Sequence, residues 1–204
     1  MKRSKRQGKA RVVARAVLPT RFGPFSIAGI KGRGPDEEAV AIQHGRLKPG
    51  TAPLVRIHSQ CLTGDVFMSE RCDCRAQLEL SLRKIAKARS GIVLYLPQEG
   101  RGIGLINKVK AYELQDEGLD TVEANRQLGF AADSRDYDFA AAALKALGVR
   151  RVRLLSNNPD KINQLERGGV RVVERIPCRP RTSHHSRAYL RTKKQKLGHI
   201  LAGL

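Results

Sequence analysis

Apolar runs and turn-forming residues alternate in a way that divides the chain into two parts. Over residues 12–58, short apolar runs are separated by Pro- and Gly-rich turns, which is typical of β-strands. The predicted strands are Val12–Leu18, Phe25–Ile30, Ala39–His44 and Leu54–Ile57. Short strands joined by such turns favour an antiparallel meander.

From residue 78 onward, apolar residues at helical spacing alternate with short apolar runs. The predicted helices are 78–86, Leu105–Gln115, 139–147, 159–167 (after the cap Asn158) and Tyr189–Leu201, and the predicted strands are Ile92–Leu96, Val149–Leu155 and Val170–Ile176. Pro177–Ser186 is expected to form a loop. This alternation favours α/β packing with some parallel strands. We therefore expect one compact, mixed α/β (α+β) domain over residues 12–204, with an N-terminal β-meander followed by an alternating α/β part.

The net charge of the chain indicates an anionic partner. Lys and Arg number 39 against 19 Asp and Glu, which gives a net charge of +20. Residues 1–11 are basic without any acid, and we expect them to form a disordered arm. Such an arm could contact nucleic acid, but aromatic residues make up only 4% of the chain and Trp is absent, which disfavours a base-stacking platform. A nucleoside triphosphate is the other candidate partner.

The sequence also bears on the compartment. No apolar run approaches the length of a membrane span, and the N-terminus has no apolar core of a secretory signal. The four cysteines show no even-spaced disulfide framework. We therefore expect a cytoplasmic protein without a membrane partner.

Three of the four cysteines form a C-x10-C-x-C pattern of Cys61, Cys72 and Cys74. In an extended segment Cys72 and Cys74 would point to the same side, so both sulfurs could bind one ion. Zinc takes thiolates in tetrahedral geometry, and three protein ligands leave a fourth position for water. Two alternatives are inert buried cysteines, and a structural site completed by His58.

Two further stretches could bind phosphate. Pro97–Gly104 follows a predicted strand and opens into a helix, and its glycines allow close approach of a ligand. Ser156–Lys161 lies between a strand end and a helix start, the usual ligand-facing edge of an α/β sheet. The alternatives are an ordinary glycine-rich turn and ordinary helix capping. From spacing alone, the pair Asp133 and Arg135 is best interpreted as a surface ion pair.

Together these stretches resemble a known family. The blocks Arg56–Asp65, Arg71–Cys74, Gln98–Leu105, Thr121–Asp136 and Ser156–Lys161 are similar, in the same order, to the signature blocks of GTP cyclohydrolase II. The resemblance implies a homodimeric, zinc-dependent hydrolase that opens the imidazole ring of GTP in the first step of riboflavin biosynthesis. It also implies release of formate and pyrophosphate, with Mg2+ on the GTP phosphates.

The resemblance further implies roles for individual residues. Cys61, Cys72 and Cys74 would bind one zinc ion per subunit, whose water would attack C8 of guanine. Asp133 would accept a proton, Tyr112 would act in the ring chemistry, and Arg135 would either attack the α-phosphate or only stabilise its charge. The implied GTP contacts are Arg56, Ile57, His58, Ser59, Gln60, Gln77, Glu99, Gly100, Arg101, Thr121, Ser156 and Lys161.

The chain departs from the family pattern at several points. Gln60 stands where the family usually has Glu, and Ser156 stands where it has Thr. The segment before Tyr189 lacks the family's Asn-rich sequence. These departures and the basic arm leave open an alternative, a drifted paralogue with altered product chemistry or with nucleic-acid binding.

Overall fold

A seven-stranded sheet organises the described part of the chain, which in this computed structural model comprises residues 9–35, 37–180, 187–198 and 200. The strands are β1 (Arg11–Thr20), β2 (Gly23–Lys31), β3 (Glu38–His44), β4 (Leu54–Ser59), β5 (Gly91–Leu96), β6 (Arg151–Leu155) and β7 (Arg171–Ile176). Their spatial order is β1-β2-β3-β5-β4-β6-β7.

The sheet is antiparallel on one side and parallel on the other. β1, β2, β3 and β5 pair antiparallel, whereas β5, β4, β6 and β7 pair parallel. The predicted meander is confirmed for its first three strands and wrong for the fourth, because β5 inserts between β3 and β4. Residues Leu54 to His58 of β4 are all buried, so this strand requires a central place with both faces covered.

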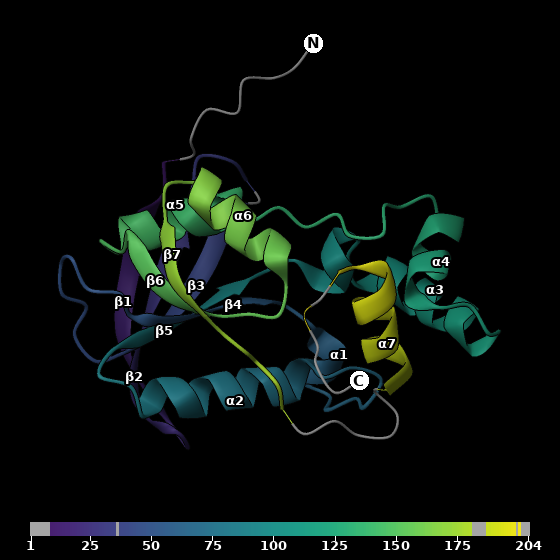
Figure 1. Cartoon of the computed structure of the whole chain (residues 1–204), viewed down its shortest axis with the longest axis horizontal. Coiled ribbons are helices and arrows are strands. Elements are labelled where there is room, and N and C mark those ends of the chain that lie inside the picture. The colour runs from purple at the N-terminus through teal and green to yellow at the C-terminus, as the bar shows by residue number, and fades with distance from the viewer. Residues whose placement is uncertain (1–8, 36, 181–186, 199, 201–204) are drawn as a thin grey trace, which may run out of the picture.

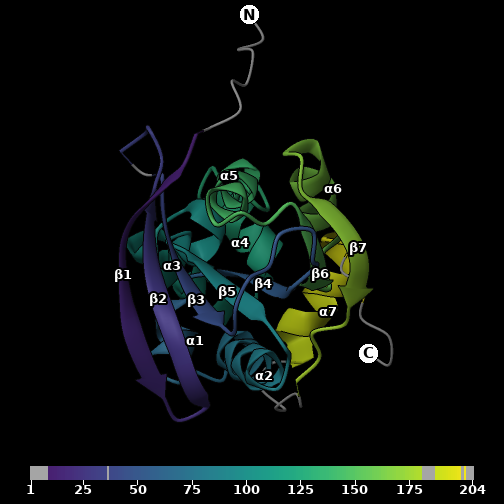
Figure 2. The same cartoon turned by 90° about the vertical axis from the view of Figure 1, so that its left-hand side faces the viewer.

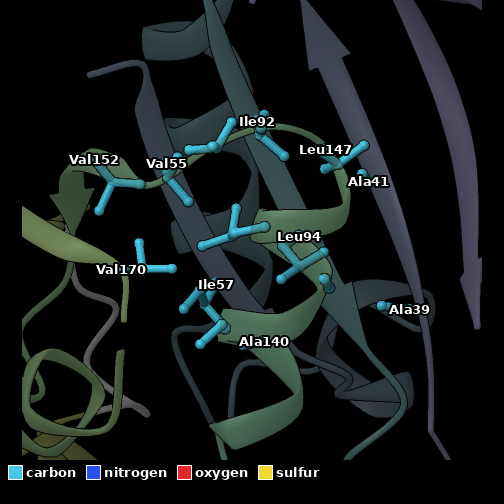
Figure 3. Packing of buried hydrophobic residues seen from close by; sticks show 14 of the residues in the cluster. Ala39, Ala41, Val55, Ile57, Ile92, Leu94, Ala140, Leu147, Val152 and Val170 are labelled. Atoms are coloured by element: carbon cyan, nitrogen blue, oxygen red, sulfur yellow. The ribbon is translucent and has the colours of Figure 1, made fainter. Parts of the chain in front are cut away.

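Helices cover both faces of the sheet, which confirms the predicted mixed α/β domain (Figure 1). Helix α2 (Cys74–Ala86) packs on one face, where its Ile85 meets Val93 of β5. Helices α5 (Asp138–Ala146) and α6 (Pro159–Arg167) cover the other face. There, Ile57 of β4 and Leu94 of β5 pack in the same buried cluster as Ala140 of α5 (Figure 3).

The remaining helices gather beyond the ends of β4 and β5, on one side of the molecule (Figure 1), and α3 and α4 therefore lie behind the strands in Figure 2. They are α1 (Leu62–Asp65), the 3₁₀ turn η1 (Glu99–Gly102), α3 (Leu105–Asp116), α4 (Thr121–Gln127) and α7 (Arg187–Lys196). Hydrophobic periodicity did not predict α4, which is fixed by a capping box between Asp120 and Glu123. The ammonium of Lys196 binds both of these carboxylates and so ties α7 to α4.

Parts of three predicted segments lie outside the described residues. These parts are residues 1–8 of the basic arm, 181–186 of the loop, and 199 and 201 of the terminal helix. Arg11, at the end of the predicted arm, already belongs to β1. Within the described ranges, no helix is both long enough and apolar enough to cross a membrane.

Candidate active site

Three thiols converge where β4 ends and α2 begins. The sulfurs of Cys61, Cys72 and Cys74 all lie within 4.8 Å of one another, with 3.6 Å between those of Cys61 and Cys72. The prediction that Cys72 and Cys74 share an extended segment is wrong, because Cys74 opens α2 and Asp73 is its N-cap residue. The sulfurs meet because the turn before α2 packs against α1.

The space around the thiols suits a metal held by sulfur. A Cβ atom at Gly64 of α1 would lie 2.9 Å from the sulfur of Cys72 and 3.2 Å from that of Cys61. The thiols therefore occupy the place that a side chain at this position would take, and a larger residue would displace a sulfur. Three thiolates at one point are the ligand set of zinc and other soft divalent metals, so the residues present fit such an ion.

Electrostatics also distinguish the three sulfurs. Hydrogen bonds from the thiols of Cys72 and Cys74, and the nearby ammonium of Lys108, hold the pKa of Cys61 far below its usual value. The hydrogen bond to Cys61 and burial raise the pKa of Cys72 to about 11, and the pKa of Cys74 lies well above its usual value for the same reasons. The cluster therefore accommodates one thiolate readily. A divalent cation would offset the repulsion between further thiolates.

A buried carboxylate, that of Asp65, lies next to the cluster. Asp65 accepts hydrogen bonds from the backbone N–H of Cys61 at 3.1 Å and from the hydroxyl of Tyr95 at 2.9 Å. The Nε2 of His58 lies 3.0 Å from the same carboxylate. His58 thus contacts Asp65 and is not part of the thiol cluster, which disfavours the structural site that this histidine would complete. Burial lowers the pKa of His58, so the ring is neutral at pH 7.

Two adjoining pockets open beside the thiols and share Ser59, Cys74, Arg135 and Tyr189 in their walls. The first pocket lies between the cluster, η1 and α3, and its empty space of about 630 Å³ is in part open solvent. Of the predicted site residues it exposes Ser59, Gln60, Cys61, Cys72, Cys74, Glu99, Gly100, Arg101, Tyr112, Thr121 and Arg135. The second pocket lies at the carboxyl end of β4 and the start of α6, and is lined by Arg56, His58, Ser59, Gln77, Arg135, Ser156 and Lys161 from the same prediction.

Several polar atoms around these pockets are buried without a hydrogen-bond partner within the described residues. They are Nε of Arg56, Nδ1 of His58 and Nη2 of Arg101. Buried polar atoms without hydrogen-bond partners are rare in native proteins, since each costs about 1–3 kcal/mol. Their concentration in residues that line the two pockets indicates that a polar ligand completes the site.

The η1 turn holds Arg101 in a strained conformation. Gly100 and Arg101 both have φ of 61°, and Gly102 has φ of 91°. A non-glycine residue in this region costs about 1 kcal/mol or more, so the surrounding contacts must hold it. The carbonyl of Arg101 accepts a hydrogen bond from the N–H of Ser134 at 3.1 Å. The turn is thereby joined to the segment that carries Asp133 and Arg135.

Asp133 and Arg135 form a partly buried ion pair with two hydrogen bonds rather than the predicted surface pair. The guanidinium binds both carboxylate oxygens, with Nε to Oδ1 at 2.8 Å, and the Arg135 side chain is only 14% exposed. Burial by itself would raise the pKa of Asp133, but the guanidinium holds that pKa below its usual value. Burial is likewise outweighed at Arg135, where the carboxylate raises the pKa above its usual range. Both groups are therefore charged at pH 7.

Most of the predicted site residues are brought together, with two exceptions. The side chain of Ile57 lies in the apolar core, and its carbonyl accepts a hydrogen bond from Lys161 Nζ at 2.8 Å. Asp133 lines neither pocket, but it binds Arg135, which lines both. Tyr112 lies beside the cluster, where its hydroxyl is 3.1 Å from the hydroxyl of Thr63.

Sequence reasoning missed Lys108, Asp65, Asn125 and Tyr189, which all lie in or against the site. Lys108 carried one usable signal, since it precedes the buried Ala111 by one helical turn on α3. Asp65 directly follows the Gly64 that the cluster requires. Asn125 and Tyr189 lie on helices whose relation to the site depends on tertiary contacts.

The fold and the site together define the class: an α/β protein with a cluster of three thiols that fits a metal ion, beside a basic, two-part pocket. Residues 10–177 match the family model for GTP cyclohydrolase II. A GTP cyclohydrolase-2 of Hahella chejuensis is 52% identical over 93% of this chain and 91% of its own length. One from Shewanella amazonensis is 50% identical over 93% of both chains. A riboflavin biosynthesis protein of Vibrio vulnificus is 50% identical over 91% of this chain but only 50% of its own length.

The chain belongs to the GTP cyclohydrolase II family, as its signature blocks predicted. It is an enzyme of that type, from a family of metal-dependent hydrolases in riboflavin biosynthesis.

Proposed function

We propose that this protein uses zinc to open the imidazole ring of GTP, with release of formate and pyrophosphate and formation of a diaminopyrimidinone ribosylamine phosphate. The observation that carries the proposal is that the thiol cluster and Arg135, which is paired with Asp133, lie on the walls of two adjoining pockets. Ring opening needs an activated water, and pyrophosphate release needs charge stabilisation at a phosphate. The first pocket contains the thiol cluster, which could activate a water through a bound metal. The second pocket contains Arg135, which could stabilise charge at a phosphate.

In the proposal, the guanine ring occupies the first pocket. Zinc held by Cys61, Cys72 and Cys74 would supply a water that is ionised near neutral pH. The hydroxyl of Tyr112 lies on the wall of this pocket and can hold or pass a proton during ring opening. Arg101 also lines this pocket and its Nη2 is buried without a hydrogen-bond partner among the described residues, so we propose that it donates to an oxygen of the bound nucleotide. The contacts that hold the strained backbone of Arg101, such as the hydrogen bond from the N–H of Ser134, would keep this residue in place before substrate binds.

The second pocket would take the triphosphate. Arg56, Arg135 and Lys161 place three cations on its wall, and α6 directs its N-terminus toward it. The described residues that line this pocket include no Asp or Glu. Mg2+ would therefore be held by the phosphates rather than by the protein.

Of the two roles considered for Arg135, charge stabilisation is the better supported. Nε and Nη2 of its guanidinium both donate to the carboxylate of Asp133, and the negative charge of this carboxylate keeps the guanidinium protonated. A protonated guanidinium has no free electron pair with which to attack phosphorus. We therefore propose that Asp133 orients Arg135, that Arg135 stabilises charge on the α-phosphate, and that water is the nucleophile.

Gln60 is compatible with this function. It lies on the wall of the first pocket and its backbone N–H donates to the carbonyl of Leu96 at 2.8 Å, so its position does not depend on its side chain. An amide both donates and accepts hydrogen bonds, whereas a carboxylate only accepts. Gln60 can therefore contact a guanine edge, although with a different preference from Glu.

The proposal also includes a homodimer with one zinc ion per subunit, in which residues 12–204 form the catalytic domain. Light scattering combined with gel filtration measures the subunit number. Metal analysis of the same sample measures the zinc content.

The decisive experiment quantifies formate and pyrophosphate together from GTP and Mg2+, with and without added zinc. Cys61→Ser should lose zinc and formate release. Cys178→Ser is the matched control, because Cys178 is buried outside the cluster and should keep both. A Cys61→Ser protein that releases formate at the wild-type rate would exclude the zinc assignment. A folded, zinc-bound wild type that forms neither product would favour a drifted paralogue.

The role of Arg135 has its own test. Arg135→Ala should abolish pyrophosphate release while zinc binding stays intact. Mass spectrometry of wild type quenched during turnover should show no nucleotide attached to the protein. A covalent nucleotide adduct on Arg135 would refute charge stabilisation as its role.

A further inference from the structure

We propose that Lys108 is a positioning residue for the thiol cluster, and that with Glu99 it locks Cys61 to the η1 turn of the first pocket. The inference rests on the proposed function, since it concerns the metal that the cluster would hold. It assigns to both residues a role through the protein rather than through the nucleotide.

The burial of Lys108 is unusual for a lysine. It lies on α3 and is only 8% exposed, whereas Lys110 on the same helix points to solvent. Lysine is almost never buried unless its ammonium is paired. Here Nζ donates to the sulfur of Cys61 at 3.1 Å and to Oε1 of Glu99 at 2.8 Å. The lysine thus bridges a proposed metal ligand and the carboxylate of the pocket turn.

Glu99 closes this bridge into a ring. Its Oε2 accepts the backbone N–H of Leu62, the residue after Cys61, at 2.5 Å. Its Oε1 also accepts the N–H of Gly100 at 2.8 Å. Both carboxylate oxygens are therefore engaged within the protein. The sequence-based expectation that Glu99 contacts GTP is better replaced, for its side chain, by a role in holding the turn and the cluster together.

The ring has two physical effects on a bound ion. Three thiolates around a divalent cation leave a net negative charge, which the ammonium of Lys108 offsets at one sulfur. The hydrogen bond also fixes the direction in which Cys61 presents its sulfur. Partners that orient metal ligands in this way typically change metal affinity by about 10–100-fold when they are removed.

The test compares Lys108→Met, Lys108→Arg and the control Lys110→Met in the full-length protein. Zinc affinity is measured by competition with a chelator. The sulfur-to-metal absorption band is recorded after loading with Co2+, and the unfolding of the metal-free protein is followed separately. We expect Lys108→Met to bind zinc about 10–100-fold more weakly and to shift the band, with Lys108→Arg in between and Lys110→Met like wild type.

The outcomes separate the two proposals. Wild-type affinity and an unchanged band in Lys108→Met would overturn the inference and leave the proposed function standing. A wild type that binds no zinc would overturn both. If Lys108→Met does not fold without metal, Glu99→Gln replaces it, because it removes the charge that holds Lys108 and keeps the shape. Zinc affinity unchanged in folded Glu99→Gln would then refute the inference, and weaker zinc binding would support it.

Discussion

Replacement of Gly64 by alanine tests the proposed metal site with a single methyl group. The added Cβ would lie 2.9 Å from the sulfur of Cys72 and 3.2 Å from that of Cys61. Nonbonded atoms of this size prefer about 3.5–4.0 Å, so one sulfur must move by about 0.6 Å. A metal site tolerates deviations of only about 0.2 Å in its bond lengths.

The metal-free protein should respond differently, because its sulfurs can move. Gly64 lies in α1 without the left-handed conformation that would favour glycine, and alanine gains up to about 1 kcal/mol over glycine in a helix. The two effects offset each other, and we expect unfolding within about 1 kcal/mol of wild type, or about 2–4 °C in Tm. Zinc affinity should instead fall at least about tenfold, or about 1.4 kcal/mol.

Chelator competition for zinc and thermal unfolding of the metal-free protein measure these two quantities on one sample. Gly29→Ala in β2 is the control, since its Cβ would meet only Val13 at an ordinary 3.4 Å, far from the thiols. Zinc binding by Gly64→Ala as tight as that of wild type would show that the three sulfurs do not hold the ion as argued.

Two further predictions concern stability. Burial lowers the pKa of His58 in the folded protein, so below about pH 6.5 the unfolded chain binds a proton that the folded chain does not. The free energy of unfolding of the metal-free protein should therefore be highest above this pH and fall as the pH drops toward the pKa of His58 in the folded protein. Chemical unfolding of His58→Gln at several pH values should show a weaker pH dependence. An equally steep dependence would contradict the assignment of this effect to His58. Asn158 caps α6 by accepting the N–H of Asp160 at 2.9 Å, so Asn158→Ala should lower stability by about 1 kcal/mol, measured by urea unfolding, and an unchanged midpoint would show that the cap contributes nothing.

Local signals in the sequence were enough for much of the fold. The ends of α6 follow from Asn158-Pro159 and from Gly168, because capping chemistry acts within a few residues. The first three strands follow from apolar runs between turns. The identity of the cluster residues Cys61, Cys72 and Cys74 also follows from their spacing and from the family blocks, although the reason given for their convergence was wrong.

Contacts between segments far apart in the sequence could not be predicted from such local signals. The central place of β4 depends on its pairing with β5 and β6, which follow it in the chain. The turn residues next to β4 do not indicate which strands it pairs with. The Asp133–Arg135 pair looked like a surface pair because its burial comes from segments distant in sequence, including the η1 turn.

The sequence by itself determined the family, which cysteines cluster and most helices and strands, because these depend on residue type and short-range spacing. Only the tertiary structure decided which charges are buried and what they bind. Lys108 lies 47 residues from Cys61, and on a helix a lysine ordinarily stays in solvent. Its place beside the thiols exists because α3, η1 and α1 pack together and bring its ammonium to the sulfur of Cys61 and the carboxylate of Glu99.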